Sequence, residues 1–218
     1  MRATAQRRIG RGLAVPIIVS MLGCAATQPV RVLAKGEHRW IASVGGPVLP
    51  NHVPTKLIPY TNLGVMYGRS GTTTVTGNVH LLAAAFGVAG IDVGAARRLR
   101  AQSGKAPELT GQAQLYGFAG NGGVRVYPNF TGTASWQMGP RTLLYGGSAA
   151  TIRPSGGTTI LVTPMLGVQQ DVRRRFAIQL ETKWMASNIN MARGLFEGEG
   201  SVADRGSMAV QLGLQVKR

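Results

Sequence analysis

The sequence predicts an all-β protein, a single antiparallel up-and-down β-barrel of about eight to ten strands that follows a cleaved signal peptide. Two observations predict the barrel. Apolar and polar residues alternate with a period of two through much of residues 37–218, which places successive side chains on opposite faces of a sheet. Turn signals rich in glycine, proline and asparagine separate these runs at short intervals.

The clearest strand covers residues 206–217. Its apolar residues all fall on one face: Met208, Val210, Leu212, Leu214 and Val216. The same pattern recurs along the chain and predicts ten strands, at residues 37–46, 59–69, 72–84, 86–99, 108–119, 123–138, 141–152, 158–170, 174–187 and 206–217. The stretch 83–90 fits a short helix equally well.

The first 23 residues have the layout of a secretory signal. Four arginines (Arg2, Arg7, Arg8 and Arg11) precede the apolar stretch 13–22, and the small residue Gly23 follows it. Ten apolar residues cover only about 15 Å as a helix, roughly half of a ~30 Å hydrocarbon core. This length predicts a cleaved leader over residues 1–23 and not a permanent membrane span.

The residues Met21-Leu22-Gly23-Cys24 resemble the lipobox of bacterial lipoproteins. The resemblance implies that the leader is removed, that the Cys24 thiol is acylated, and that residues 24–36 form a lipidated N-terminal linker. Ala25, where retained lipoproteins have Asp, implies release to the outer membrane. The alternative is an ordinary signal cleaved near Ala25 or Ala26, with Cys24 lost. Because Cys24 is the only cysteine, an internal disulfide is excluded.

The chain is strongly basic, with a formal net charge of +16. Its basic clusters, 97–100 and 173–175, fall at predicted turns, and they are neither gathered on one helix nor interleaved with aromatic residues. We therefore expect outer-membrane lipid and lipopolysaccharide phosphates as partners, and no nucleic acid. A monomer is expected, and the sequence identifies no protein partner.

Two interpretations of the apolar faces remain open. In a lipid-anchored periplasmic barrel they point inward and enclose an apolar or amphipathic ligand. In an outer-membrane barrel they point outward to lipid. Strands of about 10–13 residues and a Gln- and Thr-rich polar face favour the membrane. So do aromatic residues near strand ends, which predict an interfacial girdle: Tyr60, Tyr67, Tyr116, Trp136, Tyr145 and Trp184.

Across residues 37–218 this pattern resembles small bacterial outer-membrane β-barrels. The resemblance implies an outer-membrane location and a structural, adhesive or small-solute role without catalysis. An even strand number places both barrel ends of the chain in the periplasm and the long linkers 47–58 and 188–205 outside. One departure is the C-terminus Val216-Lys217-Arg218, where such barrels usually end in an aromatic residue.

Candidate functional side chains are few. Strand parity predicts a polar cluster in the barrel lumen formed by Arg175, Glu181, Lys183 and His80, with Asp92 and Arg125 as further candidates. Three histidines (His38, His52 and His80) without a catalytic or metal-binding motif predict neither an enzyme nor a cofactor or metal. A remaining alternative is a barrel-embedded lipid hydrolase that uses His80 with Ser135.

Overall fold

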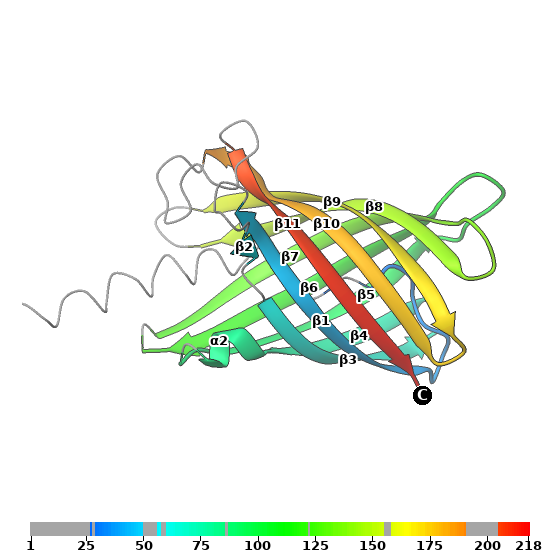
Figure 1. Ribbon diagram of the computed structural model, residues 1–218, viewed down its shortest axis with the longest axis horizontal. Coiled ribbons are helices and arrows are strands. Elements are labelled where there is room, and N and C mark those ends of the chain that lie inside the picture. Colours follow the sequence, from blue (N-terminus) through cyan, green and yellow to red (C-terminus); the bar gives the residue numbers. More distant parts are fainter. Residues whose placement is uncertain are drawn as a thin grey trace, which may run out of the picture.

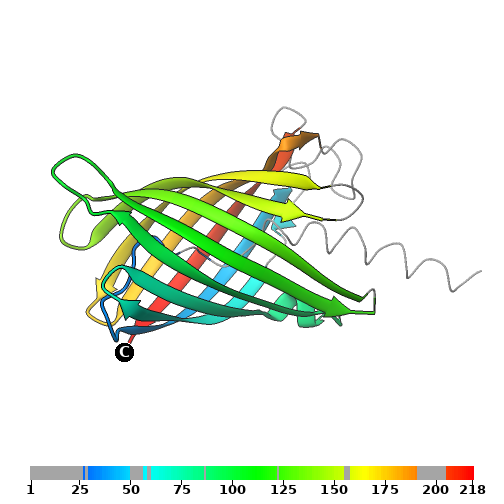
Figure 2. The same ribbon diagram turned by 180° about the vertical axis from the view of Figure 1, so that it is seen from behind.

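The protein forms one closed β-barrel (Figure 1, and from behind in Figure 2), which confirms the predicted fold class. The computed structural model describes residues 27, 29–49, 56–57, 60–85, 87–121, 123–154, 158–190 and 205–218. Most of these residues lie in strands, and the only described helix is a single short one.

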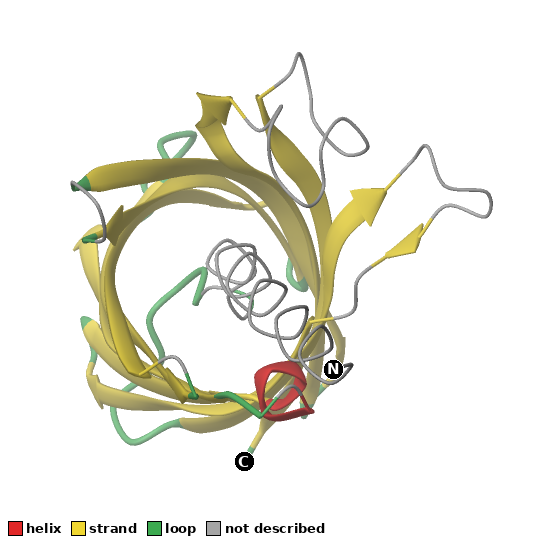
Figure 3. Cartoon of the chain, turned by 90° about the vertical axis from the view of Figure 1, so that its left-hand side faces the viewer, coloured by secondary structure: helices red, strands yellow, loops and turns green. Residues whose placement is uncertain are grey.

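Ten long strands make the wall: β1 (His38–Leu49), β3 (Tyr60–Ser70), β4 (Thr73–His80), β5 (Ala89–Arg100), β6 (Glu108–Gly120), β7 (Gly123–Gln137), β8 (Thr142–Arg153), β9 (Thr159–Arg173), β10 (Phe176–Asn190) and β11 (Arg205–Lys217). Each pairs antiparallel with its neighbour in the sequence, and β11 pairs with β1 to close the ring (Figure 3). A barrel closed in this way has no free strand edge.

Two details differ from the predicted strands. The very short strand β2 (Lys56–Leu57), which the sequence pattern did not predict, pairs only with the end of β1. The predicted strand 72–84 ends at His80, because helix α2 (Leu81–Ala85) follows it directly. The helical alternative for the start of 83–90 therefore holds, and β5 begins at Ala89. The alanine-rich run after His80 lacks the period-two alternation that would continue the strand.

The apolar rows of the strands face outward. Ile178 is 41% exposed and Leu212 is 49% exposed, whereas Gln179 and Gln211 beside them are buried inside the ring. Phe176, Leu180 and Leu214, which belong to the same rows, are exposed as well. The barrel therefore has the inside-out arrangement of an outer-membrane-type fold, and the apolar residues do not converge on a core.

The predicted aromatic girdle is only partly correct. Tyr67 is exposed and its row faces outward, and the indole N–H groups of Trp136 and Trp184 donate to carbonyls on the barrel exterior. Three tyrosines (Tyr60, Tyr116 and Tyr145) are instead buried in the lumen. The prediction was wrong for them because each lies on the same strand face as the inward polar residues. The strand face, and not the position along the strand, determines whether a side chain points into the lumen.

The two ends of the barrel differ. At the end we call proximal, β1 begins, β11 ends, and the turns after β3, β7 and β9 are short. The opposite, distal end carries α2 and the two longest connections in the chain, residues 50–59 and 191–204. None of the described helices is long and apolar enough to cross a membrane.

Candidate functional site

The lumen is lined by polar side chains that bond to one another. In its proximal half, Lys183 Nζ lies 2.9 Å from Glu181 Oε1, and the hydroxyl of Tyr145 donates to Glu181 Oε2 at 2.8 Å. Gln179 donates to the Tyr145 hydroxyl at 2.7 Å, and Gln215 donates to Gln179 at 3.0 Å. Side chains from β8, β10 and β11 are thereby joined across the interior. We call this group the proximal network.

The proximal network continues to the mouth of the barrel. Arg39 donates from Nη1 to Gln215 at 2.9 Å and from Nε to Glu37 at 2.8 Å. Glu37 in turn accepts a bond from the backbone N–H of Ala34 at 3.2 Å. A continuous chain of polar contacts thus links the middle of the lumen to the residues that precede β1.

Those residues, 29–37, form a segment inside the proximal mouth; we call them the N-terminal segment (Figure 3 shows the chain inside the ring). Val30 and Leu33 are buried, Val30 against Leu143 and Tyr145, and Leu33 against Ile41 and Met66. Part of the predicted linker 24–36 therefore packs against the inner face of the wall, whereas residues 34–36 are exposed.

Arg31 attaches the N-terminal segment to β7, to the start of β6 and to the connection between β5 and β6. Its Nε donates to the Ser135 hydroxyl at 3.0 Å, its Nη2 bonds to Gln102, and its Nε lies 4.0 Å from Glu108 Oε1. On another side, the backbone N–H of Leu33 donates to the Thr74 hydroxyl at 2.7 Å. The segment is thus held by bonds to strands on different sides of the barrel.

Two glycines in the wall leave room for the chain inside. The Gly68 carbonyl accepts a bond of 2.8 Å from the backbone N–H of Gly36, and a Cβ added to Gly68 would overlap the carbonyl oxygen of Ala34. A Cβ added to Gly213 would lie 2.7 Å from the Thr27 hydroxyl. Since glycine in a strand marks the close approach of another group, these positions fit an occupied lumen.

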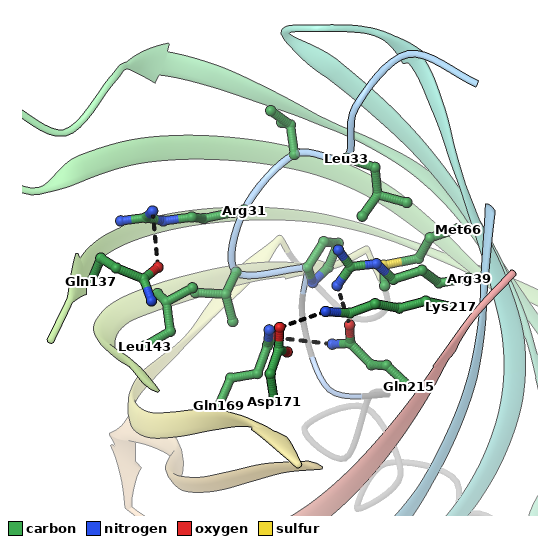
Figure 4. A pocket seen from close by; sticks show the side chains of 13 residues that line it. Arg31, Leu33, Arg39, Met66, Gln137, Leu143, Gln169, Asp171, Gln215 and Lys217 are labelled. Carbon is green, nitrogen blue, oxygen red and sulfur yellow. Dashed lines mark hydrogen bonds and ion pairs between the residues drawn. The ribbon is translucent and has the colours of Figure 1, made fainter. Parts of the chain in front are cut away.

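A cavity of roughly 220 Å³ remains between the N-terminal segment and the wall (Figure 4). Its lining combines Arg31, Arg39 and Lys217 with Asp171, whose Oδ2 lies 2.5 Å from Lys217 Nζ. Ligand pockets are commonly about 300–1,000 Å³, so this space suits water or a small polar solute.

A second group of polar contacts, the distal network, surrounds His80. His80 Nε2 lies 3.0 Å from Asp92 Oδ2, and Asn78 donates to Asp92 Oδ1 at 2.7 Å. Gln114 donates to the same Asp92 oxygen at 3.4 Å, and Asn129 donates to Gln114 at 3.3 Å. The carboxylate of Asp92 is therefore surrounded by donors, as a buried charge requires.

A cluster of aromatic side chains lies in the lumen at the distal end. Tyr60, Tyr116, Phe118 and Tyr127 cluster there with Ala83 of α2. The His80 ring lies 5.2 Å from Phe118 and 6.2 Å from Tyr116, measured between ring centroids. Described residues thus occupy successive levels of the lumen, from the N-terminal segment, through two polar networks, to this aromatic cluster.

The structure places the predicted site residues in three locations. Glu181 and Lys183 are paired in the proximal network, whereas His80 lies in the distal network with Asp92. Arg175 does not join either group: it is exposed in the turn before β10, which begins at Phe176. Its predicted place in the lumen was wrong because parity applies only within a strand. Arg125 is half-buried on β7, without a bond to either network.

His80 and Ser135 lie far apart. The register aligns Asp92 with Tyr116 and Tyr116 with Tyr127, and Ser135 is eight residues further along β7. At about 3.3 Å per residue this separation is roughly 26 Å along the strand. Within the described residues, no three His, Cys, Asp or Glu side chains form a group that could hold a metal ion. Cys24 and His52 lie outside the described residues.

The residues that sequence analysis missed are those of the N-terminal segment and their partners, above all Arg31, Gln102 and Glu108. No periodicity marks a segment that is neither strand nor helix. The inward-facing glycines of β3 and β11 were the available signal.

No protein-family model matches the chain, and no curated protein matches it. Several solved structures are similar to it, among them the following three. A de novo designed transmembrane β-barrel is 13% identical over 86% of this chain and 99% of its own, with a TM-score of 0.39. The anion-selective porin from Comamonas acidovorans is 15% identical over 73% of this chain and 49% of its own, with a TM-score of 0.36. The translocator domain of the autotransporter NalP from Neisseria meningitidis is 9% identical over 95% of this chain and 94% of its own, with a TM-score of 0.44.

Proposed function

We propose that this protein is a non-catalytic β-barrel of the bacterial outer membrane with a structural or adhesive role. The observation that carries the proposal is the arrangement of the wall: apolar residues such as Leu180 and Leu212 face outward, and charged residues such as Glu181 and Asp92 are buried inside. A water-soluble barrel would have the opposite arrangement, because exposed apolar rows on every strand would aggregate in water.

The residues that occupy the lumen favour a closed barrel over an open solute channel. In a barrel of about ten strands, side chains are large enough to fill the interior. Here the proximal network, the distal network and the N-terminal segment occupy successive levels of it. The cavity beside Arg31 and Lys217 supports a second candidate role, the binding of a small polar solute at the proximal mouth.

Two measurements on the purified protein test the proposal. A folded membrane barrel should migrate differently on a gel before and after boiling, because the closed sheet resists detergent until it is heated. Inserted into a planar bilayer, it should show little or no steady conductance. A protein whose migration does not change, or a steady open pore, would contradict the proposal.

The leader over residues 1–23 and lipid attachment at Cys24 are part of the same proposal. Thr27, three residues after Cys24, is buried in the lumen beside Gly213. Three residues span at most about 11 Å, so a lipid on Cys24 would be tethered near this lumenal position. Insertion of that lipid into the surrounding bilayer would draw the start of the N-terminal segment toward the mouth.

The lipid has its own test. Cells that express the protein are grown with labelled palmitate, and label on the wild type that is lost in Cys24→Ala supports acylation. A mature N-terminus at Ala25 or Ala26 without label would show an ordinary signal peptide instead.

The absence of catalysis is tested directly. Purified protein in mixed micelles with phospholipid should release no fatty acid above the rate of a His80→Ala variant. Release that depends on His80 would support the hydrolase alternative and overturn the non-catalytic proposal.

A further inference from the structure

The exposed basic side chains gather at the proximal end of the barrel. Ten of them lie on the hairpins and chain ends there, and we call this group the basic collar: Lys35, Arg69, Arg97, Arg100, Lys105, Arg141, Arg173, Arg174, Arg175 and Arg218. At the distal end, Arg205 is the single exposed basic residue among the side chains that the structure describes. Among the exposed side chains that the structure describes, positive charge is therefore concentrated at the proximal end.

Acidic residues at the proximal end do not neutralise the basic collar. Glu37, Glu108 and Asp171 each face a cation in the barrel mouth, namely Arg39, Arg31 and Lys217, at distances of 2.8, 4.0 and 2.5 Å. In the part of the chain that the structure describes, no member of the collar forms an ion pair. Its charge is thus available to an external anion.

The collar begins where the apolar rows end. Arg69 follows Tyr67 on the outward row of β3, and Arg97 extends the outward row of β5 that contains Val93. Around the β9–β10 turn, three arginines, 173–175, stand between the exposed Val172 and Phe176. In a bilayer this height corresponds to the headgroup region, where long basic side chains extend toward phosphates.

We infer that the basic collar binds the phosphates of anionic glycerophospholipids in the leaflet at the proximal end. A guanidinium group bonds to two phosphate oxygens at once, so an arginine-rich ring at headgroup height matches this chemistry. The inference rests on the proposed function, because short turns face the periplasm in outer-membrane barrels and this end carries the short turns. That leaflet contains glycerophospholipid, whereas lipopolysaccharide belongs to the opposite one.

The three tryptophans allow each end to be measured separately. Trp40 is 56% exposed near the start of β1, and Trp136 lies near the end of β7, so both report on the proximal end. Trp184 pairs in register with Met208 and reports on the distal half. The variant Trp184→Phe therefore keeps only the two proximal tryptophans. The double variant Trp40→Phe with Trp136→Phe keeps only the distal one.

The full-length protein is reconstituted in vesicles in which brominated phosphatidylglycerol competes with phosphatidylcholine, and tryptophan quenching gives the relative affinity at each end. We expect the affinity for phosphatidylglycerol divided by that for phosphatidylcholine to be several-fold above one at Trp40 and Trp136. The same ratio should be near one at Trp184. Arg174→Gln with Arg175→Gln should lower the proximal ratio several-fold, toward one. The matched pair Arg125→Gln and Arg205→Gln at the distal end should leave it unchanged.

Equal ratios at both ends, or a proximal ratio that the collar variant does not alter, would overturn the inference. So would displacement of phosphatidylcholine from the proximal reporters by lipopolysaccharide but not by phosphatidylglycerol. Failure of the proposed function would look different: no tryptophan would be quenched by any brominated lipid, and boiling would not change gel migration.

Discussion

Glu181 and Lys183 form an ion pair inside the barrel, although they are alternate residues of the same strand. Lys183 Nζ lies 2.9 Å from Glu181 Oε1, and neither side chain is more than 3% exposed. The pair persists in this enclosed space because Tyr145 donates to the second carboxylate oxygen. A buried charge keeps its ionised form only when such partners surround it.

Loss of one partner of this pair should destabilise the barrel. Lys183→Met leaves Glu181 as a buried carboxylate without its cation, and we expect the free energy of unfolding to fall by about 3–5 kcal/mol. The double variant Glu181→Gln with Lys183→Met should lose less, because no unpaired charge remains. Urea unfolding in detergent, followed by the gel shift, measures both, and Lys105→Met is an exposed control. A single variant as stable as the control would contradict the assigned pairing.

Arg31 should hold the N-terminal segment in the barrel mouth. Its bonds to Ser135 and Gln102 involve a charged donor, worth about 1.5–3 kcal/mol each, so Arg31→Ala should make local opening at least about a hundred times more frequent. The measurement is the rate at which an impermeant maleimide modifies Val30→Cys in a Cys24→Ala background. The control is Lys35→Ala, which removes an exposed cation from the same segment. Equal rates in the two variants would mean that Arg31 does not hold the segment.

A larger side chain at Gly68 should expel the N-terminal segment. The added atoms of Gly68→Val would overlap the Ala34 backbone, which cannot move aside by a side-chain rotation. We expect the variant to conduct in planar bilayers more than the wild type does. Gly132→Val is the control, because a Cβ there meets nothing within 4 Å. A folded Gly68→Val barrel with wild-type conductance would show that the segment does not close the lumen.

A charge on the outward face should be costly only if that face meets lipid. Leu212→Arg is expected to lower the free energy of unfolding in vesicles by about 2–4 kcal/mol, whereas Leu212→Ala should cost less. In a protein surrounded by water, arginine at an exposed site would have little effect. Equilibrium unfolding from vesicles by urea distinguishes the two situations.

Period-two alternation predicted the wall well because side-chain direction in a strand is a local property. The ten long strands agree with their predicted ranges to within a few residues at nearly every end. The exception is β4, where His80 is followed by the alanine-rich turn of α2. Arg175 was placed wrongly for a related reason. It lies in a turn, where side chains do not alternate between two faces as they do in a strand.

The contents of the lumen could not be predicted in the same way. The Arg31–Ser135 bond joins residues 104 positions apart, and the contact of His80 with Asp92 depends on the register between β4 and β5. Strand parity placed His80 and Asp92 in the lumen but did not give their pairing. No local pattern marks Arg31 or Ser135, and only the closed barrel brings those two together.

The central claim is that the apolar face of each strand meets lipid while the polar face meets a filled lumen. The most direct measurement is a series of single cysteines at residues 208–212 and 214–216, in a Cys24→Ala background, each carrying a spin label in reconstituted vesicles. Labels at Met208, Val210, Leu212 and Leu214 should collide with oxygen dissolved in the bilayer, and labels at Ala209, Gln211 and Gln215 should be protected from it. Protected labels at Leu212 and Leu214, with exposure at Ala209 and Gln211, would contradict the account.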